Sequence, residues 1–170
     1  DAKAGDVVLA PEGKHLPQIG NKAIEVIQIE FKSGKTPRWT TTAAEIDVFK
    51  ALVKEYQEGN WASWSKHYAD TAKTFHNTTT GITPAALQER HQATIKKLAS
   101  YRFSDKEIFY ERVVDNNGDT WVYFWATWEG KTVAASQEIV VPVHIALKFV
   151  NNKIVREYAY YDASKFADLK

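Results

Sequence analysis

The stretch Glu58 to Asn77, EGNWASWSKHYADTAKTFHN, decides the fold, because it joins the end of one helix to a second short helix and then to a strand. Gly59-Asn60 supplies a helix stop followed by a fresh helix cap. Aromatic residues at positions 61, 64 and 68 recur at helical spacing, and the alternation from Lys73 to Asn77 is typical of a strand. This order predicts a pocket, with His76 on the strand beside it.

Composition narrows the classes of function. A chain of 170 residues with 44% hydrophobic residues is the size of one ordinary domain. It contains no cysteine, which excludes disulfides, thiolate metal sites and thiol redox chemistry. Its 22 basic and 21 acidic residues give a net charge of +1, which argues against nucleic-acid binding because phosphate recognition needs a concentrated basic surface. No stretch approaches the roughly 18 apolar residues of a membrane span.

The start of the chain bears on its location. The chain begins at Asp1 and contains no methionine, so we expect that an initiator residue has been removed. A cleaved export signal is one explanation. We therefore expect a secreted or periplasmic location in preference to a cytoplasmic one.

The sequence divides into an arm and a domain. Residues 1–41, called the arm below, are rich in glycine and proline and contain one apolar alternation, from Ile24 to Phe31. That alternation could add an edge strand, or the arm could be a poorly ordered leader. Residues 42–170 form the predicted domain. They begin with a helix whose apolar stripe includes Leu52 and Tyr56, and a later helix follows Thr83-Pro84.

The second half of the chain has the period of strands. Strands are predicted over residues 101–114, 120–128, 136–150 and 153–162, with turn sequences between them, so they should meander antiparallel. Helices first and strands last indicate an α+β fold in which the sheet curves around helices on one side. The segment Trp121 to Trp128 (WVYFWATW) is apolar at both alternating sets of positions. Its outer face therefore needs a partner, and we predict a homodimer through that face.

Two segments resemble a known superfamily. EGNWASWSKHYADTAKTFHN is similar to the glycine turn, short helix and "YADDA" strand entry of the nuclear transport factor 2-like superfamily, and NNKIVREYAYYDASKF is similar to its closing "GKI" strand. The resemblance covers about residues 43–166 and points to the SnoaL-like, polyketide cyclase-like branch. It implies a cone-shaped, curved antiparallel sheet wrapped around the N-terminal helices. The same fold carries enzymes, binding modules and interaction domains.

The resemblance also implies positions for catalytic groups. Ketosteroid isomerases have their general-base aspartate at the position of His76, and their oxyanion-stabilising tyrosine at the position of Leu52, so a steroid isomerase assignment fails at both. SnoaL-like cyclases have an acid/base aspartate where this chain has Ala159. Asp162 lies three residues further on, which in a regular strand points to the opposite face.

The candidate catalytic residues are His76 and Glu157. A histidine can move a proton near neutral pH, although His76 could equally be a hydrogen-bonded core residue. Glu157 is the acidic group expected beside the cavity, and without a cation it should be protonated. The residues expected to bind a ligand are Tyr56, Trp61, Trp64, His91, Trp125 and Tyr161.

Some alternatives stay open at this point. His91 could simply pack in its helix. A different strand register would bring His144 and Asp162 to the pocket in place of Glu157 and Tyr161, and otherwise His144 belongs to the dimer interface. No short-range spacing such as HExxH supports a zinc site, and no glycine-rich phosphate loop is present, so we predict no metal and no cofactor.

Three functions compete. The first is a binding protein for a small apolar or aromatic ligand, with no assignable reaction. The second is a SnoaL-like lyase or isomerase that uses His76 as acid and base, so whether the protein is an enzyme stays open. The third is a protein-interaction or dimerisation module whose pocket is filled by side chains. A cavity of a few hundred cubic ångströms would separate the first two from the third.

Overall fold

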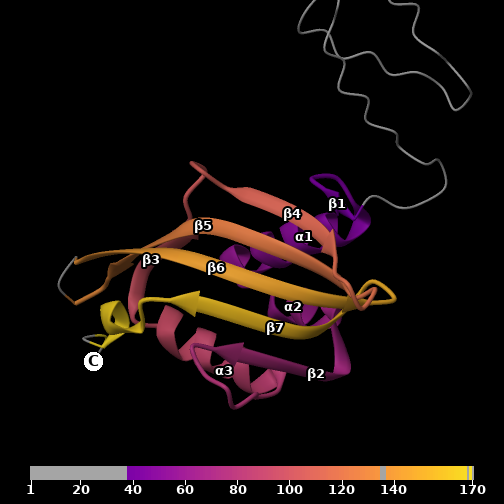
Figure 1. The fold of residues 1–170 in the computed structure, drawn as a ribbon. Coiled ribbons are helices and arrows are strands. Elements are labelled where there is room, and N and C mark those ends of the chain that lie inside the picture. The colour runs from indigo at the N-terminus through magenta and orange to yellow at the C-terminus, as the bar shows by residue number, and fades with distance from the viewer. Residues whose placement is uncertain (1–37, 135–136, 168, 170) are drawn as a thin grey trace, which may run out of the picture. The chain divides into compact units, whose positions relative to one another are not determined.

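The computed structural model describes residues 38–134, 137–167 and 169. The strand considered for Ile24 to Phe31 lies outside the described residues, as does most of the arm. The described part contains three α-helices, two short 3-10 helices and a seven-stranded sheet (Figure 1). The strands are β1 (Trp39–Thr40), β2 (Tyr68–His76), β3 (Leu98–Phe103), β4 (Phe109–Val114), β5 (Thr120–Thr132), β6 (Glu138–Val150) and β7 (Lys153–Tyr161).

The helices begin and end where local chemistry favours it. α1 (Ala44–Glu58) ends at Gly59, whose φ of 68° is a left-handed conformation that suits glycine. The side chain of Asn60 then caps α2 (Trp61–Trp64), which continues into the 3-10 helix η1 (Ser65–His67). The Thr83 hydroxyl caps α3 (Pro84–Ile95), and a second 3-10 helix, η2 (Ala163–Phe166), follows the last strand.

The sheet is curved and mixed. Its strands lie in the order β1-β4-β5-β6-β7-β2, and β3 pairs with the far half of β5. All pairs are antiparallel except β2 with β7, which run parallel. The predicted α+β fold, a curved sheet around helices, is confirmed. Two details differ: one pair is parallel, and the single strand predicted over residues 101–114 is two strands, β3 and β4, that meet different parts of β5.

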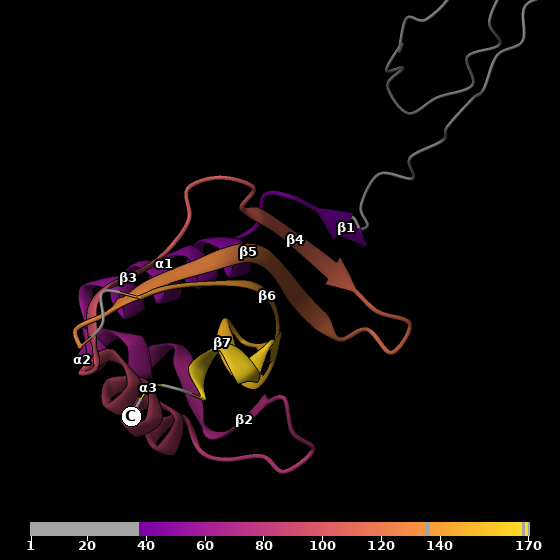
Figure 2. The same ribbon diagram turned by 90° about the vertical axis from the view of Figure 1, so that its left-hand side faces the viewer.

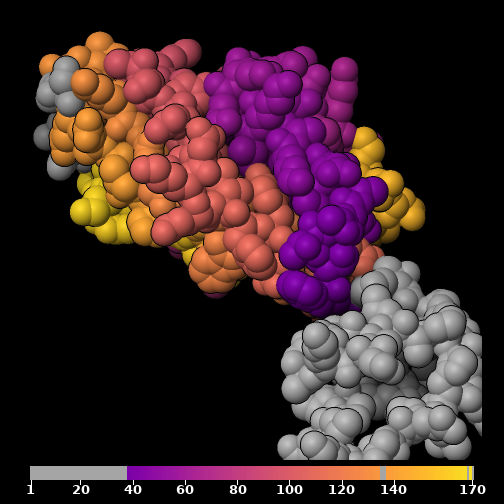
Figure 3. Space-filling view, turned by 90° about the horizontal axis from the view of Figure 1, so that it is seen from above, coloured from indigo at the N-terminus to yellow at the C-terminus, as the bar shows by residue number. Residues whose placement is uncertain are grey.

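The helices cover only one face of the sheet, as Figure 2 shows. On this inner face Val122 and Phe124 of β5 are fully buried against Ile46 and Phe49 of α1 in the hydrophobic core. Figure 3 shows the edge where β1 and α1 lie beside β4. Alternate residues of β5, such as Trp125, point to the outer face. One apolar set of the segment WVYFWATW therefore faces the helices, and the other lies on the outer face. Within the described residues, no helix is long and apolar enough to cross a membrane.

Candidate functional site

The parallel pairing of β2 with β7 brings together a buried cluster of polar side chains. His76 and Glu157 both point to the inner face, and the His76 Nε2 atom lies 2.8 Å from Glu157 Oε1. The Tyr68 hydroxyl donates to the other carboxylate oxygen, Oε2, over 2.5 Å. The side chains of His76 and Glu157 are only 11% and 5% exposed. Glu157 is therefore held by one donor on each oxygen, in a site nearly closed to bulk water.

This cluster keeps Glu157 ionised. Burial alone would raise the pKa of its carboxyl group, but the hydrogen bonds that its oxygens accept from His76 and Tyr68 hold that pKa below its ordinary value. The expectation of a protonated Glu157 assumed that no cation was near. It is wrong because two hydrogen-bond donors, His76 and Tyr68, stabilise the charged carboxylate.

The carboxylate also sets which nitrogen of His76 carries a proton. An ionised carboxylate only accepts hydrogen bonds, so His76 Nε2 must be the N–H donor, and in the neutral ring Nδ1 is a free acceptor. Every fully buried side-chain nitrogen or oxygen of the described residues has a hydrogen-bond partner. Nδ1 makes no hydrogen bond to any described residue, so it must be open to the cavity that His76 lines or to solvent. This arrangement suits a proton acceptor.

His91 is a second, neutral imidazole beside the first. Its ring centroid lies 5.6 Å from that of His76, and its other neighbours are the rings of Tyr56, Trp61 and Trp64. Burial lowers the pKa of His91 to about 4. The side chain is therefore uncharged near neutral pH.

A cavity of about 220 Å³ opens beside these groups. Its walls are mostly apolar, and its polar members are two histidines, one glutamate, one threonine, three tyrosines and the indoles of Trp64 and Trp128. The lining residues are Phe49, Leu52, Val53, Tyr56, Trp64, Tyr68, His76, His91, Thr94, Phe103, Trp128, Val143, Ile145, Glu157, Ala159, Tyr161, Ala163 and Phe166. The centre of the fold is therefore not filled by side chains.

Most of the predicted ligand-binding residues meet at this cavity. Tyr56, Trp64, His91 and Tyr161 line it together with His76 and Glu157. Trp61 does not line it but lies against His91, with ring centroids 6.3 Å apart.

The prediction for Trp125 is wrong. Its side chain is 51% exposed on the outer face of the sheet, because it occupies the alternating set of β5 opposite to Phe124 and Trp128. Sequence alternation separates the two sets but does not say which one faces the helices.

The alternative register is also not the one observed. β6 and β7 pair Ile145 with Ala159 and Val143 with Tyr161 on the inner face, which leaves His144 on the outer face. The His144 ring stacks on Trp125 at 3.9 Å. Asp162 is exposed and caps η2 by accepting from the Ser164 backbone amide. Neither His144 nor Asp162 lines the cavity beside His76.

Sequence analysis missed two polar residues of the site. Tyr68, taken as part of an aromatic stripe, is the second donor to Glu157. Trp128 donates its indole N–H to the Tyr56 hydroxyl oxygen over 3.2 Å, so the Tyr56 O–H can itself donate into the cavity. The only signal for Tyr68 was its position at the start of the strand that carries His76. The pairing of Trp128 with Tyr56, 72 residues away, had none.

Asn77 fixes the end of this site. Its side-chain amide donates to the Tyr161 carbonyl over 2.7 Å, and its side-chain oxygen accepts from the Tyr161 amide over 3.1 Å. These bonds tie the ends of β2 and β7 together next to His76.

As for metals, the described residues contain no cluster of three or more histidine, cysteine, aspartate or glutamate side chains able to hold an ion.

Comparison with known proteins identifies the fold. No protein-family model matches the chain, and no curated protein matches its sequence. Similar solved structures include IdmH from Streptomyces antibioticus, a proposed polyketide cyclase, with a TM-score of 0.61 at 11% identity over 75% of this chain and 98% of that one. A proposed SnoaL-like polyketide cyclase from Shewanella putrefaciens has a TM-score of 0.58 at 12% identity, covering 75% and 96% of the two chains. A protein with a ketosteroid isomerase-like fold from Catenulispora acidiphila has a TM-score of 0.56 at 13% identity, covering 71% and 88%.

These structures share the nuclear transport factor 2-like fold. The chain described here has that fold, which confirms the resemblance predicted from its sequence. At identities this low the comparisons identify the fold and leave the activity open.

Proposed function

We propose that this protein binds a small, largely apolar molecule in the cavity beside His76. The observation that carries the proposal is the cavity itself, about 220 Å³ with apolar and aromatic walls and a few polar groups gathered at His76. Binding sites for small molecules have this composition, and the volume is slightly below their common range of roughly 300–1,000 Å³. The ligand should therefore be small. The open space argues against an interaction module with a filled pocket.

A second function is favoured by the pairing of His76 with Glu157. A histidine whose Nε2 is held by a buried carboxylate and whose Nδ1 is open has the arrangement of a general base. The Tyr56 hydroxyl, which accepts from Trp128, is the donor we propose for a ligand oxygen that becomes negative. In this proposal the protein is a lyase or isomerase that moves a proton on a small carbonyl compound, as the polyketide cyclase descriptions of its structural neighbours suggest.

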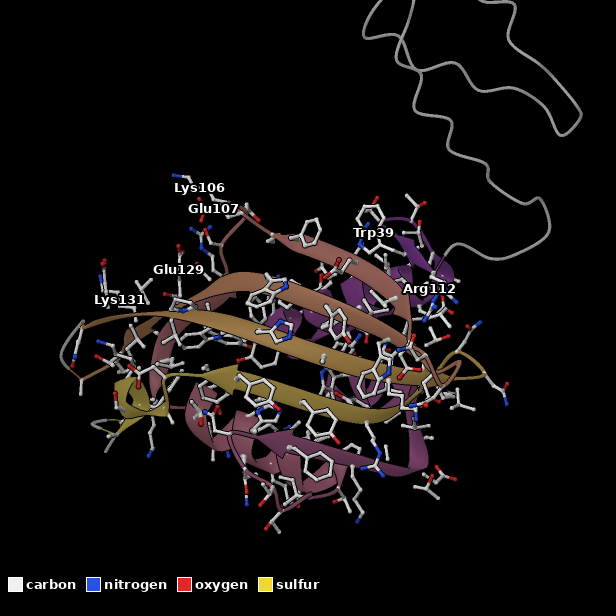
Figure 4. The ribbon with its side chains drawn as sticks, viewed as in Figure 1. Trp39, Lys106, Glu107, Arg112, Glu129 and Lys131 are labelled. Carbon is white, nitrogen blue, oxygen red and sulfur yellow. The ribbon has the colours of Figure 1, made fainter. Side chains whose placement is uncertain are left out.

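The outer face of the sheet supports a proposal about assembly. A row of side chains crosses four strands there, with Phe109, Trp125, His144 and Tyr160 paired in register. Trp125 and Tyr160 are 51% and 55% exposed. Figure 4 views this face with its side chains drawn, and Trp39 is labelled near the β1 edge. Exposed aromatic surface of this kind favours association, and we propose that two copies of the chain meet through it.

The binding proposal is tested with a substitution that blocks the cavity without disturbing the core. Ala163 lines the cavity yet is exposed in η2, so a larger side chain there should occupy the opening. Ala167 is also exposed, lies just after η2 and does not line the cavity, so it is the matched control.

Calorimetric screening of small neutral aromatic compounds should find ligands for the wild-type protein. Ala163→Phe should weaken their binding at least tenfold, whereas Ala167→Phe should leave it unchanged. Ligands that bind both variants equally would show that the site lies elsewhere.

A further inference from the structure

The polar end of the cavity indicates which chemical group the ligand carries. Glu157 is not the group expected to bind the ligand, because each of its oxygens already accepts a hydrogen bond from His76 or Tyr68. Nδ1 of His76 is different. Since Glu157 fixes one proton on Nε2, Nδ1 in the neutral form of the His76 ring is an acceptor and calls for a donor on the ligand.

His91 also needs a hydrogen-bond partner on the ligand. No described residue forms a hydrogen bond with either of its ring nitrogens, and its contacts are with aromatic rings and His76. A neutral imidazole has one N–H donor and one acceptor. A hydroxyl group both donates and accepts, so one hydroxyl can bond the acceptor of one ring and the donor of the other. The rings, 5.6 Å apart between centroids, are close enough to share a single group.

The charge of the cavity disfavours an acidic ligand. Among the described residues that line it there is no lysine or arginine, and Glu157 is a carboxylate. A ligand carboxylate or phosphate would lie near that negative charge without a cation of its own. The aromatic walls, by contrast, suit a flat and neutral body.

From these contacts we infer that the ligand is a small planar molecule with a weakly acidic hydroxyl group, a phenol or an enol, whose O–H donates to His76 Nδ1. The inference rests on the proposed binding function. When the proton moves, the ligand O–H bond breaks and an N–H bond forms at Nδ1. The imidazolium is then neutralised by Glu157, and the ligand keeps the electron pair as phenolate or enolate.

The test uses three compounds of the same shape. para-Nitrophenol carries the hydroxyl, para-nitroanisole replaces its proton with a methyl group, and para-nitrobenzoate carries a carboxylate. Calorimetry gives the affinities, and visible absorption distinguishes bound nitrophenol from nitrophenolate. The measurement is made at a pH at which the free phenol is mostly protonated. The phenol should bind about tenfold more tightly than the anisole, the value of one good hydrogen bond, with absorption shifted toward the phenolate.

Two histidine variants locate the effect. His76→Gln should remove both the preference for the phenol and the spectral shift while still binding the anisole, which reports an intact cavity. His144→Gln, on the outer face, should change neither. If His76→Gln does not fold, the wild-type comparison of phenol with anisole still decides.

Other results would overturn the inference in distinguishable ways. Equal affinities for phenol and anisole, or tightest binding of the benzoate, would refute the hydroxyl ligand and leave the binding cavity standing. Failure of all three compounds to bind would count against the proposed function as well.

Discussion

His91 should make the stability of the protein depend on pH between about 4 and 6.5. Its pKa falls from 6.5 in the unfolded chain to about 4 in the folded protein. In that interval the unfolded chain binds a proton that the folded protein does not, so stability is fully present above about pH 6.5 and is lost as pH falls. The difference of about 2.5 pH units, at 1.36 kcal/mol each, corresponds to about 3 kcal/mol of unfolding free energy.

The assay is urea unfolding of the wild-type protein, His91→Leu and His91→Gln at a series of pH values. Neither replacement titrates, so both variants should lose about 3 kcal/mol less stability than the wild type between about pH 7 and about pH 4. Leucine and glutamine differ in polarity and packing, but neither takes up a proton. A change in pH dependence that both variants share therefore reports the lost imidazole titration and not altered packing. Identical pH profiles for the wild type and both variants would refute the assignment of a neutral, buried imidazole at position 91.

Three further perturbations follow from the structure. Glu157→Gln removes the carboxylate that accepts from His76 and Tyr68, and thermal unfolding near neutral pH should show a loss of about 2 kcal/mol. That loss should shrink as pH falls below about 4.5, because Glu157 of the unfolded chain then takes up a proton before Glu157 of the folded protein does; a constant loss would contradict an ionised Glu157. Phe49→Ala, at a side chain 1% exposed, should cost about 3–5 kcal/mol in urea unfolding, whereas exposed Lys50→Ala should stay near the wild type; equal losses would argue against the packing described. Trp125→Glu should convert a dimer to the 19.3 kDa monomer in light scattering, and a monomeric wild-type protein would refute the proposed assembly.

Local patterns in the sequence were sufficient for much of the fold. The apolar stripe that includes Leu52 gave the buried side of α1. The turn sequence between the last two predicted strands gave the turn between β6 and β7, where Asn151 and Asn152 have positive φ. Gly59-Asn60 marked the boundary between α1 and α2. These signals involve residues within a few positions of one another, so a single sequence contains them.

Features that depend on distant segments were not accessible in the same way. The parallel contact of β2 with β7 joins residues about 80 positions apart, such as His76 and Glu157, and only that contact explains why Glu157 is ionised. The same limit applies to Trp125, whose face depends on which side of the sheet the helices cover. The break between β3 and β4 arises because they pair with different halves of β5, which the alternation from Tyr101 to Val114 does not reveal.

The most direct test of the account is a crystal structure of the protein in complex with para-nitrophenol. We predict the ring inside the cavity between α1 and the curved sheet, with its oxygen within hydrogen-bond distance of His76 Nδ1 and His76 Nε2 still bonded to Glu157. A ligand bound only on the outer face beside Trp125, or a cavity closed by side chains in the crystal, would contradict the proposed binding site.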